Sequence, residues 1–122
     1  MKFIIRRFKG IIIAISGMFF LLKNEDSIKV QSICILLIVS LGYYFEITKN
    51  EWIIHIILMG FILTTEALNT VAEKICDYIN PKYDDRIKLI KDISAGAVSF
   101  AVISSLIVLF IIYYPYVSAS LK

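Results

Sequence analysis

The chain has 122 residues, of which 59% are hydrophobic and 19% are charged, and its formal net charge is +3. A soluble domain of this length could not bury so much apolar surface in one core. The composition therefore excludes an ordinary water-soluble globular protein and favours a small single-domain membrane protein, residues 1–122. The modest charge gives no reason to expect a nucleic-acid partner.

The N-terminal segment, residues 1–23, begins with basic residues and continues with apolar ones. The basic residues are Lys2, Arg6, Arg7 and Lys9. The apolar stretch that follows, residues 10–22, is too short to cross about 30 Å of hydrocarbon as a helix. We therefore predict an amphipathic helix in the membrane interface, with its basic side chains at the lipid headgroups. A signal peptide is the alternative, although no small-x-small cleavage site follows.

A charged hinge, residues 23–29, leads into the first predicted transmembrane helix, residues 28–48. The second predicted span, residues 51–79, opens with Trp52, a residue type that is enriched at membrane interfaces. This span is expected to end before Pro81, because proline cannot continue a helix.

The third predicted span, residues 87–118, lies within a long uncharged run, residues 93–121. That run exceeds the roughly 18 apolar residues that indicate a transmembrane helix unaided. Its terminal tyrosines are expected at the far interface, where Pro115 should kink or fray the helix. His55, near the start of the second span, is expected to be a hydrogen-bonded interfacial residue. The predicted fold is thus an all-α membrane protein with one surface helix and three transmembrane helices.

The distribution of lysine and arginine predicts the orientation. Six lie within residues 1–29 and four within residues 82–91, against one in residues 46–51 and one at the C-terminus. Because basic loops remain in the cytoplasm, the N-terminus should be cytoplasmic and the C-terminus outside.

A row of polar residues interrupts the second span, at Glu66, Asn69, Glu73 and Asp77. At about 100° per residue these side chains share a stripe roughly 80° wide, which rises about 16 Å along the helix. Carboxylates inside or beside a membrane are costly, so they normally face the helix bundle and mark a functional path. We name these four residues the acidic stripe.

Several charged residues should lie near the cytoplasmic membrane surface, namely Glu25, Glu73, Asp77, Lys91 and Asp92. Carboxylates such as Glu25 and Glu73 could hold Mg²⁺ together with substrate phosphates if the hinge folds against the second span. Glu66, two turns deeper than Glu73, suits a general base toward a lipid hydroxyl, and Lys91 could neutralise phosphate charge. These residues suggest phosphoryl transfer to a lipid alcohol. Structural ion pairs, or a proton-coupled transporter with Glu66 as its carrier site, are at least as compatible with them.

The stretch from Glu66 to Val98 also carries a longer pattern, Glu-x-x-Asn-x-x-x-Glu-x-x-x-Asp, followed by a short loop, Lys-Asp and small residues. This pattern resembles the signature of the small bacterial integral-membrane diacylglycerol kinases. The outlying residues fit as well, since Glu25 precedes Glu66 by 41 positions and Lys91 follows it by 25. The resemblance extends from Arg6 to about Ile111.

The resemblance implies a homotrimer in the bacterial cytoplasmic membrane, with active sites shared between neighbouring subunits. It implies Glu66 as the catalytic base and Glu25 and Glu73 as ligands of Mg²⁺, with ATP as the phosphoryl donor. The implied nucleotide-contacting residues are Arg6, Lys91 and Asp92, with Lys82, Tyr83 and Asp84 beside the nucleotide. Asn69 and Asp77 match further polar positions of the site.

Details of the pattern distinguish two branches of that family. The Asn-Thr pair at residues 69–70, the Asn-Pro-x-Tyr loop at residues 80–83 and the Ala-Gly-Ala-Val stretch resemble the Gram-positive branch, which is similar to undecaprenol kinases. Undecaprenol is therefore the expected acceptor and diacylglycerol the next. The chain departs from that branch at Ser27, Asp84 and Ile90, where Asn, His and Ala are usual.

Overall fold

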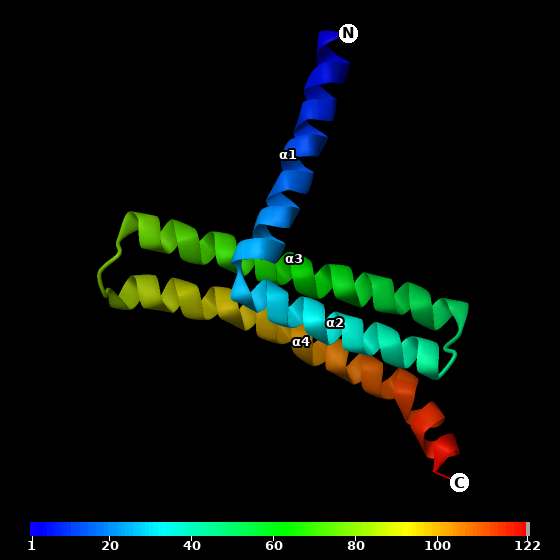
Figure 1. Ribbon diagram of the computed structural model, residues 1–122. Coiled ribbons are helices and arrows are strands. Elements are labelled where there is room, and N and C mark those ends of the chain that lie inside the picture. The colour runs from blue at the N-terminus through cyan, green and yellow to red at the C-terminus, as the bar shows by residue number, and fades with distance from the viewer. Residues whose placement is uncertain (122) are drawn as a thin grey trace.

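The computed structural model describes residues 1–121 as four helices joined by short connections (Figure 1). The helices are α1 (Lys2–Asn24), α2 (Asp26–Tyr44), α3 (Lys49–Ile79) and α4 (Asp85–Ser120). Helices α2, α3 and α4 are each long and apolar enough to cross a membrane. The predicted all-α fold is confirmed, and the chain is a multi-pass membrane protein. How each helix lies in the bilayer stays a prediction.

Helices α2, α3 and α4 lie alongside one another, whereas α1 leaves this bundle at a steep angle (Figure 1). Helix α3 contacts both α2 and α4. Helix α2 begins part-way along the bundle, so the α3–α4 hairpin extends beyond it at the end that carries the α3–α4 loop (Figure 1). The hinge between α1 and α2 therefore meets α3 near its middle, close to the acidic stripe.

The bundle buries few apolar side chains and exposes many. Among the described residues, the buried apolar ones are Ile28, Ile47, Cys76, Ala101 and Ile112. Large apolar residues such as Leu36, Ile57 and Phe110 are more than half exposed. This distribution suits helices whose surroundings are lipid chains, because a bilayer solvates apolar surface that water would not.

The turn between α2 and α3 is tight. Helix α2 ends at Tyr44, so the last residues of the span expected at 28–48 form this turn instead. Glu46 adopts a positive φ of 51°, the left-handed conformation that reverses the chain. Thr48 then caps α3 in a capping box with Glu51. Gly42 permits the close packing, because a Cβ there would lie 2.9 Å from Cη2 of Trp52.

A polar network beside this turn joins the three bundle helices; we call Glu51, His55, Tyr113 and Tyr116 the aromatic cluster. His55 is 1% exposed, with Nδ1 2.7 Å from the carbonyl oxygen of Glu51 and Nε2 3.0 Å from the hydroxyl of Tyr113. The Tyr113 hydroxyl also lies 3.2 Å from the carbonyl oxygen of Ile38 on α2. Tyr116 donates to Oε2 of Glu51 at 2.7 Å. His55 is hydrogen-bonded, as the sequence predicted.

Pro115 lies inside α4, and the helix continues past it to Ser120. The last turns of α4 point away from the other helices (Figure 1). A proline lacks the N–H that would bond the preceding turn, which explains a bend here without an end to the helix.

Candidate active site

The acidic stripe runs from a buried to an exposed part of α3. Glu66 is 6% exposed and Asn69 is 9% exposed, whereas Glu73 and Asp77 are exposed. The two buried members lie nearer the middle of α3, and the exposed members lie nearer its end at the α3–α4 loop. A single helix face therefore connects the apolar interior with the charged end of the molecule.

Glu66 has no hydrogen-bond or cation partner among residues 1–121. With the residue 6% exposed, an unpaired charge there is costly, although its carboxylate oxygens are not among the fully enclosed atoms. Its oxygens are correspondingly free to accept a proton from a molecule bound beside it. This is the arrangement required of a general base.

Asn69 links the buried and exposed parts of the stripe. Its Nδ2 donates to Oε1 of Glu73 at 3.3 Å. Its Oδ1 is buried and, within the described part of the chain, has no hydrogen-bond partner. A carboxamide oxygen is the kind of hard donor that Mg²⁺ prefers, although here Nδ2 rather than Oδ1 faces the Glu73 carboxylate. By ligand type, the oxygens of Asn69 and Glu73 fit a hard divalent cation.

The hinge brings a second carboxylate to α3. Glu25 lies between α1 and α2, and its Oε1 is 2.8 Å from Nζ of Lys74, the neighbour of Glu73 in the sequence. The hinge thus folds against the second span, which was the condition for Glu25 and Glu73 to act together. Residues 1–121 contain no group of three or more acidic, histidine or cysteine side chains with metal-binding geometry. Any metal site here would rest on fewer protein ligands, completed by phosphate oxygens.

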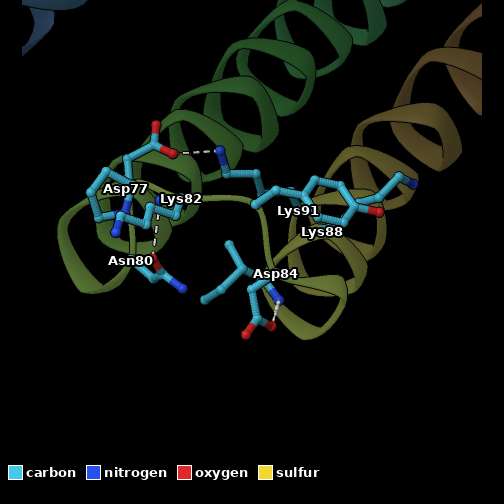
Figure 2. A pocket seen from close by; sticks show the side chains of 9 residues that line it. Asp77, Asn80, Lys82, Asp84, Lys88 and Lys91 are labelled. Carbon is cyan, nitrogen blue, oxygen red and sulfur yellow. Dashed lines mark hydrogen bonds and ion pairs between the residues drawn. The ribbon is translucent and has the colours of Figure 1, made fainter.

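The α3–α4 loop and the adjoining helix ends line an open hollow of about 400 Å³ (Figure 2). Its lining residues are Asp77, Asn80, Pro81, Lys82, Tyr83, Asp84, Ile87, Lys88 and Lys91. We call this the loop hollow. Figure 2 shows Lys91 reaching from α4 to the carboxylate of Asp77 on α3, with which it forms an ion pair. The Oδ1 of Asn80 accepts from the Lys82 backbone at 3.0 Å, which fixes the start of the loop.

The structure therefore brings together, in the loop hollow, five of the residues singled out in the sequence. These are Asp77, Lys82, Tyr83, Asp84 and Lys91. Asp92 borders the same place through an ion pair with Lys88. Three lysines line this hollow together with Asp77 and Asp84, and Lys88 and Lys91 are ion-paired, so these two would exchange a carboxylate for a phosphate on binding one.

Asp84 also has a structural role, because it caps the N-terminus of α4. Its Oδ1 accepts from the backbone amides of Arg86 at 2.8 Å and Ile87 at 3.3 Å. The hydrogen bonds from the amides of Ile87 and Arg86, and then the Arg86 guanidinium, hold the pKa of this carboxyl below its usual range. An aspartate here is thus a helix cap, which gives one physical reason for its presence where the Gram-positive branch usually has His.

Arg6 is not brought to this site within one chain. It lies on α1, near the end of the molecule farthest from the bundle (Figure 1), and lines a separate hollow on that helix. The sequence analysis, in turn, did not single out Lys74 or Lys88. Lys88 could have been found because it precedes Lys91 by three positions and so shares its helix face. Lys74 gave no comparable signal, since its partner Glu25 is distant in the sequence.

Comparisons with known proteins now bear on this geometry. The sequence profile of the prokaryotic diacylglycerol kinase family matches residues 12–113. The chain belongs to this family. It is also 34% identical, over 107 residues, to a protein named undecaprenol kinase from Bacillus subtilis (strain 168), and the match covers 87% of each chain. The chain is therefore a membrane lipid kinase. Membership of the family implies ATP as the phosphoryl donor and a lipid as the acceptor.

Proposed function

We propose that this lipid kinase transfers the γ-phosphoryl group of ATP to the hydroxyl of undecaprenol, with diacylglycerol as the second candidate acceptor. The similar Bacillus subtilis protein is an undecaprenol kinase, which supports the first choice. The transporter alternative has less support, because the chain belongs to a kinase family and a transporter has no evident use for the loop hollow.

The buried, unpartnered carboxylate of Glu66 is the observation on which the proposal depends. Glu66 accepts the proton of the lipid hydroxyl as that oxygen attacks the γ-phosphorus. A new phosphorus–oxygen bond forms, the bond to the bridging oxygen of ADP breaks, and the proton remains on Glu66. Catalysis of this type depends on positioning and on charge neutralisation.

An apolar hollow of about 350 Å³ supports a lipid route to Glu66. It lies among α1, α2 and α3, and Ala67, the residue after Glu66, contributes to its lining. The remaining lining residues are Met18, Leu21, Leu22, Ile28, Gly60, Leu63, Thr64 and Leu68. Only Thr64 among them has a polar side chain, so the hollow suits a hydrocarbon chain whose hydroxyl end approaches the acidic stripe.

The loop hollow supplies the nucleotide end of the proposed site. Lys82, Lys88 and Lys91 offset phosphate charge there, and Tyr83 and Asp84 lie beside the nucleotide. Lys91 forms an ion pair with Asp77, so its ammonium is oriented toward the stripe. Asp92 steadies Lys88.

Glu25, Glu73 and the free Oδ1 of Asn69 would hold Mg²⁺. When bound there, the ion would supply positive charge to offset that of the phosphates. The protein's part is to present these oxygens where the hinge meets α3, beside the acidic stripe.

We also propose that the kinase is a homotrimer in the bacterial cytoplasmic membrane, with its N-terminus and the loop hollow on the cytoplasmic side. The steep angle between α1 and the bundle suits a helix that lies along the membrane surface (Figure 1). In this arrangement Arg6 would reach the nucleotide of a neighbouring subunit. The basic residues of the N-terminal segment and of the α3–α4 loop support the orientation.

The experiment is transfer of labelled γ-phosphate from Mg-ATP by the purified protein in mixed micelles. Undecaprenol and diacylglycerol are offered in parallel, with and without a chelator of Mg²⁺. We expect chelator-sensitive label on undecaprenol, at a higher kcat/KM than on diacylglycerol. Preferential label on diacylglycerol would overturn the choice of lipid, and label on neither lipid would overturn the proposed reaction.

A further inference from the structure

Two of the ion pairs in residues 1–121 join different elements of the fold. One includes a residue of the acidic stripe, and the other includes the sequence neighbour of Glu73. Lys91 on α4 pairs with Asp77, and Lys74 on α3 pairs with Glu25 in the hinge. The other described pairs join residues two to four positions apart. Lys91 already has a place in the proposed reaction, whereas Lys74 has none.

We propose that the Lys74 ammonium is the counter-ion of the Glu25 carboxylate and that a binding divalent cation displaces it. Lys74 thereby sets the cation concentration at which the site fills. The inference rests on the proposed function, since it takes Glu25 as a metal ligand.

The two partners of this pair differ in their freedom to move. The Lys74 side chain is 58% exposed, whereas that of Glu25 is 20% exposed. The ammonium can therefore turn into solvent while the carboxylate stays against α3. Exposed ion pairs of this kind are weak, so the open arrangement is accessible at equilibrium. A divalent cation, with twice the charge of an ammonium, then competes for the same oxygen.

The hinge does not depend on Lys74 for its position. The Glu25 backbone N–H donates to the carbonyl oxygen of Leu21, and its own carbonyl oxygen accepts from Lys29. Ile28, in the first turn of α2, is 3% exposed and anchors the hinge in the bundle. Removal of the Lys74 charge should therefore free the Glu25 carboxylate without moving it. The gain in cation affinity from losing the competing ammonium should then exceed any loss from a less ordered Glu25 side chain.

The same lysine is the sequence neighbour of Glu73, the second proposed metal ligand. Through its ion pair, Lys74 compensates the negative charge of Glu25. The same positive charge must move away when a metal ion arrives, which makes Lys74 a positioning residue rather than a catalytic one.

The test is binding of Mn²⁺, a hard cation that accepts the same oxygen ligands, to the full-length protein in micelles without nucleotide. The loss of the free Mn²⁺ signal in electron paramagnetic resonance gives the Kd. We expect Lys74→Met and Lys74→Gln to bind Mn²⁺ about threefold to fivefold more tightly than the wild type, as befits loss of an exposed ion pair. Lys74→Arg, which keeps the charge, should remain within about twofold of the wild type.

Two controls isolate the contact from a general change in charge. Lys29→Met removes a hinge lysine that pairs with Asp26 instead, and it should leave the Kd nearly unchanged. In a Glu25→Gln background, Lys74→Met should no longer tighten Mn²⁺ binding.

An unchanged or raised Kd in Lys74→Met and Lys74→Gln, or no measurable Mn²⁺ binding by the wild type and these variants alike, would overturn the proposal. So would an equal gain in the Glu25→Gln background or in Lys29→Met. Phosphate transfer by the wild-type protein, measured in parallel, separates this failure from failure of the proposed function. An active wild type with a Kd insensitive to Lys74 refutes only the role of Lys74.

Discussion

The aromatic cluster and the acidic stripe both contain buried polar residues of α3, yet these residues differ in their hydrogen bonding. In the aromatic cluster His55 is almost fully buried and both its ring nitrogens have partners. In the acidic stripe Glu66 is nearly as buried but has no partner among residues 1–121, and Oδ1 of Asn69 is likewise free. The cluster joins three helices, whereas the stripe presents unsatisfied oxygens.

The difference shows how a membrane protein uses polar groups for two purposes. A buried polar group that is fully hydrogen-bonded contributes to stability and fixes how helices pack. A buried group that is left unpaired weakens the fold and persists where a ligand supplies the missing partner. The two regions should therefore respond differently to mutation, one in stability and the other in turnover.

The largest expected effect comes from exchanging carboxylate for carboxamide at one residue of each region. Glu66→Gln should lower kcat by about 10²–10⁴-fold, because the amide cannot accept the lipid proton, and should leave stability unchanged or raised. The matched change Glu51→Gln should keep kcat near wild type, since glutamine can still accept the hydrogen bond from Tyr116. For each variant, initial rates in mixed micelles measure kcat, and unfolding by SDS in the same micelles measures stability. Full activity of Glu66→Gln would remove the proposed base.

The next effect concerns the exposed end of the stripe. Glu73→Gln should raise the Mg²⁺ concentration needed for half-maximal rate by about tenfold or more, because one hard anionic ligand is lost. The folded fraction in an SDS titration should not change, since Glu73 is exposed. A Mg²⁺ titration that superimposes on that of the wild type would contradict the ligand role.

At the other end of α3, packing should dominate. Gly42→Ala places a Cβ 2.9 Å from Trp52 and 3.1 Å from Ile47, so it should destabilise the fold by about 1–3 kcal/mol. Gly96→Ala is the matched control, since a Cβ there meets nothing within 4 Å. Both are measured by SDS unfolding. Equal stability of the two variants would show that the α2–α3 turn is not tightly packed.

A smaller loss is expected from the hydroxyl that joins α4 to the other helices. Tyr113→Phe leaves Nε2 of His55 and the carbonyl oxygen of Ile38 without this partner, and should cost about 1 kcal/mol. Tyr114→Phe, at an exposed position, should cost less than about half of that. If the two variants unfold at the same SDS fraction, the cluster does not stabilise the bundle.

The smallest expected effect depends on pH and lies in the loop hollow. The pKa of Asp84 is lowered in the folded chain, so its capping is fully present above the unfolded pKa of about 4 and is lost as pH falls through the folded value. Hydrogen-exchange protection of the Arg86 and Ile87 amides should decrease in that range. Asp84→Asn, which caps without titrating, should keep its protection. A matching decrease in that variant would assign the change to another group.

Much of the architecture follows from local sequence. Helical periodicity placed Glu66, Asn69, Glu73 and Asp77 on one face, and Pro81 marked the end of α3. These features depend on interactions between residues close in sequence, or on the lipid environment that a run of apolar residues requires. The end of α2 was harder to predict, because Glu46 adopts a left-handed conformation that its residue type does not favour.

The site was only partly predictable from the sequence, because some of its contacts join residues that are distant in the chain. The expectation that Glu25 approaches α3 was conditional on the hinge, and the pairing of Glu25 with Lys74 had no signal in the sequence. The loop hollow gathered five predicted residues because they flank one short connection. Arg6 lies on α1, away from this hollow, so its proposed role in nucleotide binding would require a neighbouring subunit.

By itself, the sequence determined the number of helices, their apolar surfaces and the row of carboxylates on α3, because each arises from residue types repeated at helical spacing. Only the tertiary structure decided which helix lies opposite each face. It paired Lys74 with Glu25, Lys91 with Asp77, and His55 with Tyr113. Periodicity specifies one helix surface at a time, whereas these contacts depend on how separate helices pack, through short-range fits between side chains distant in the chain.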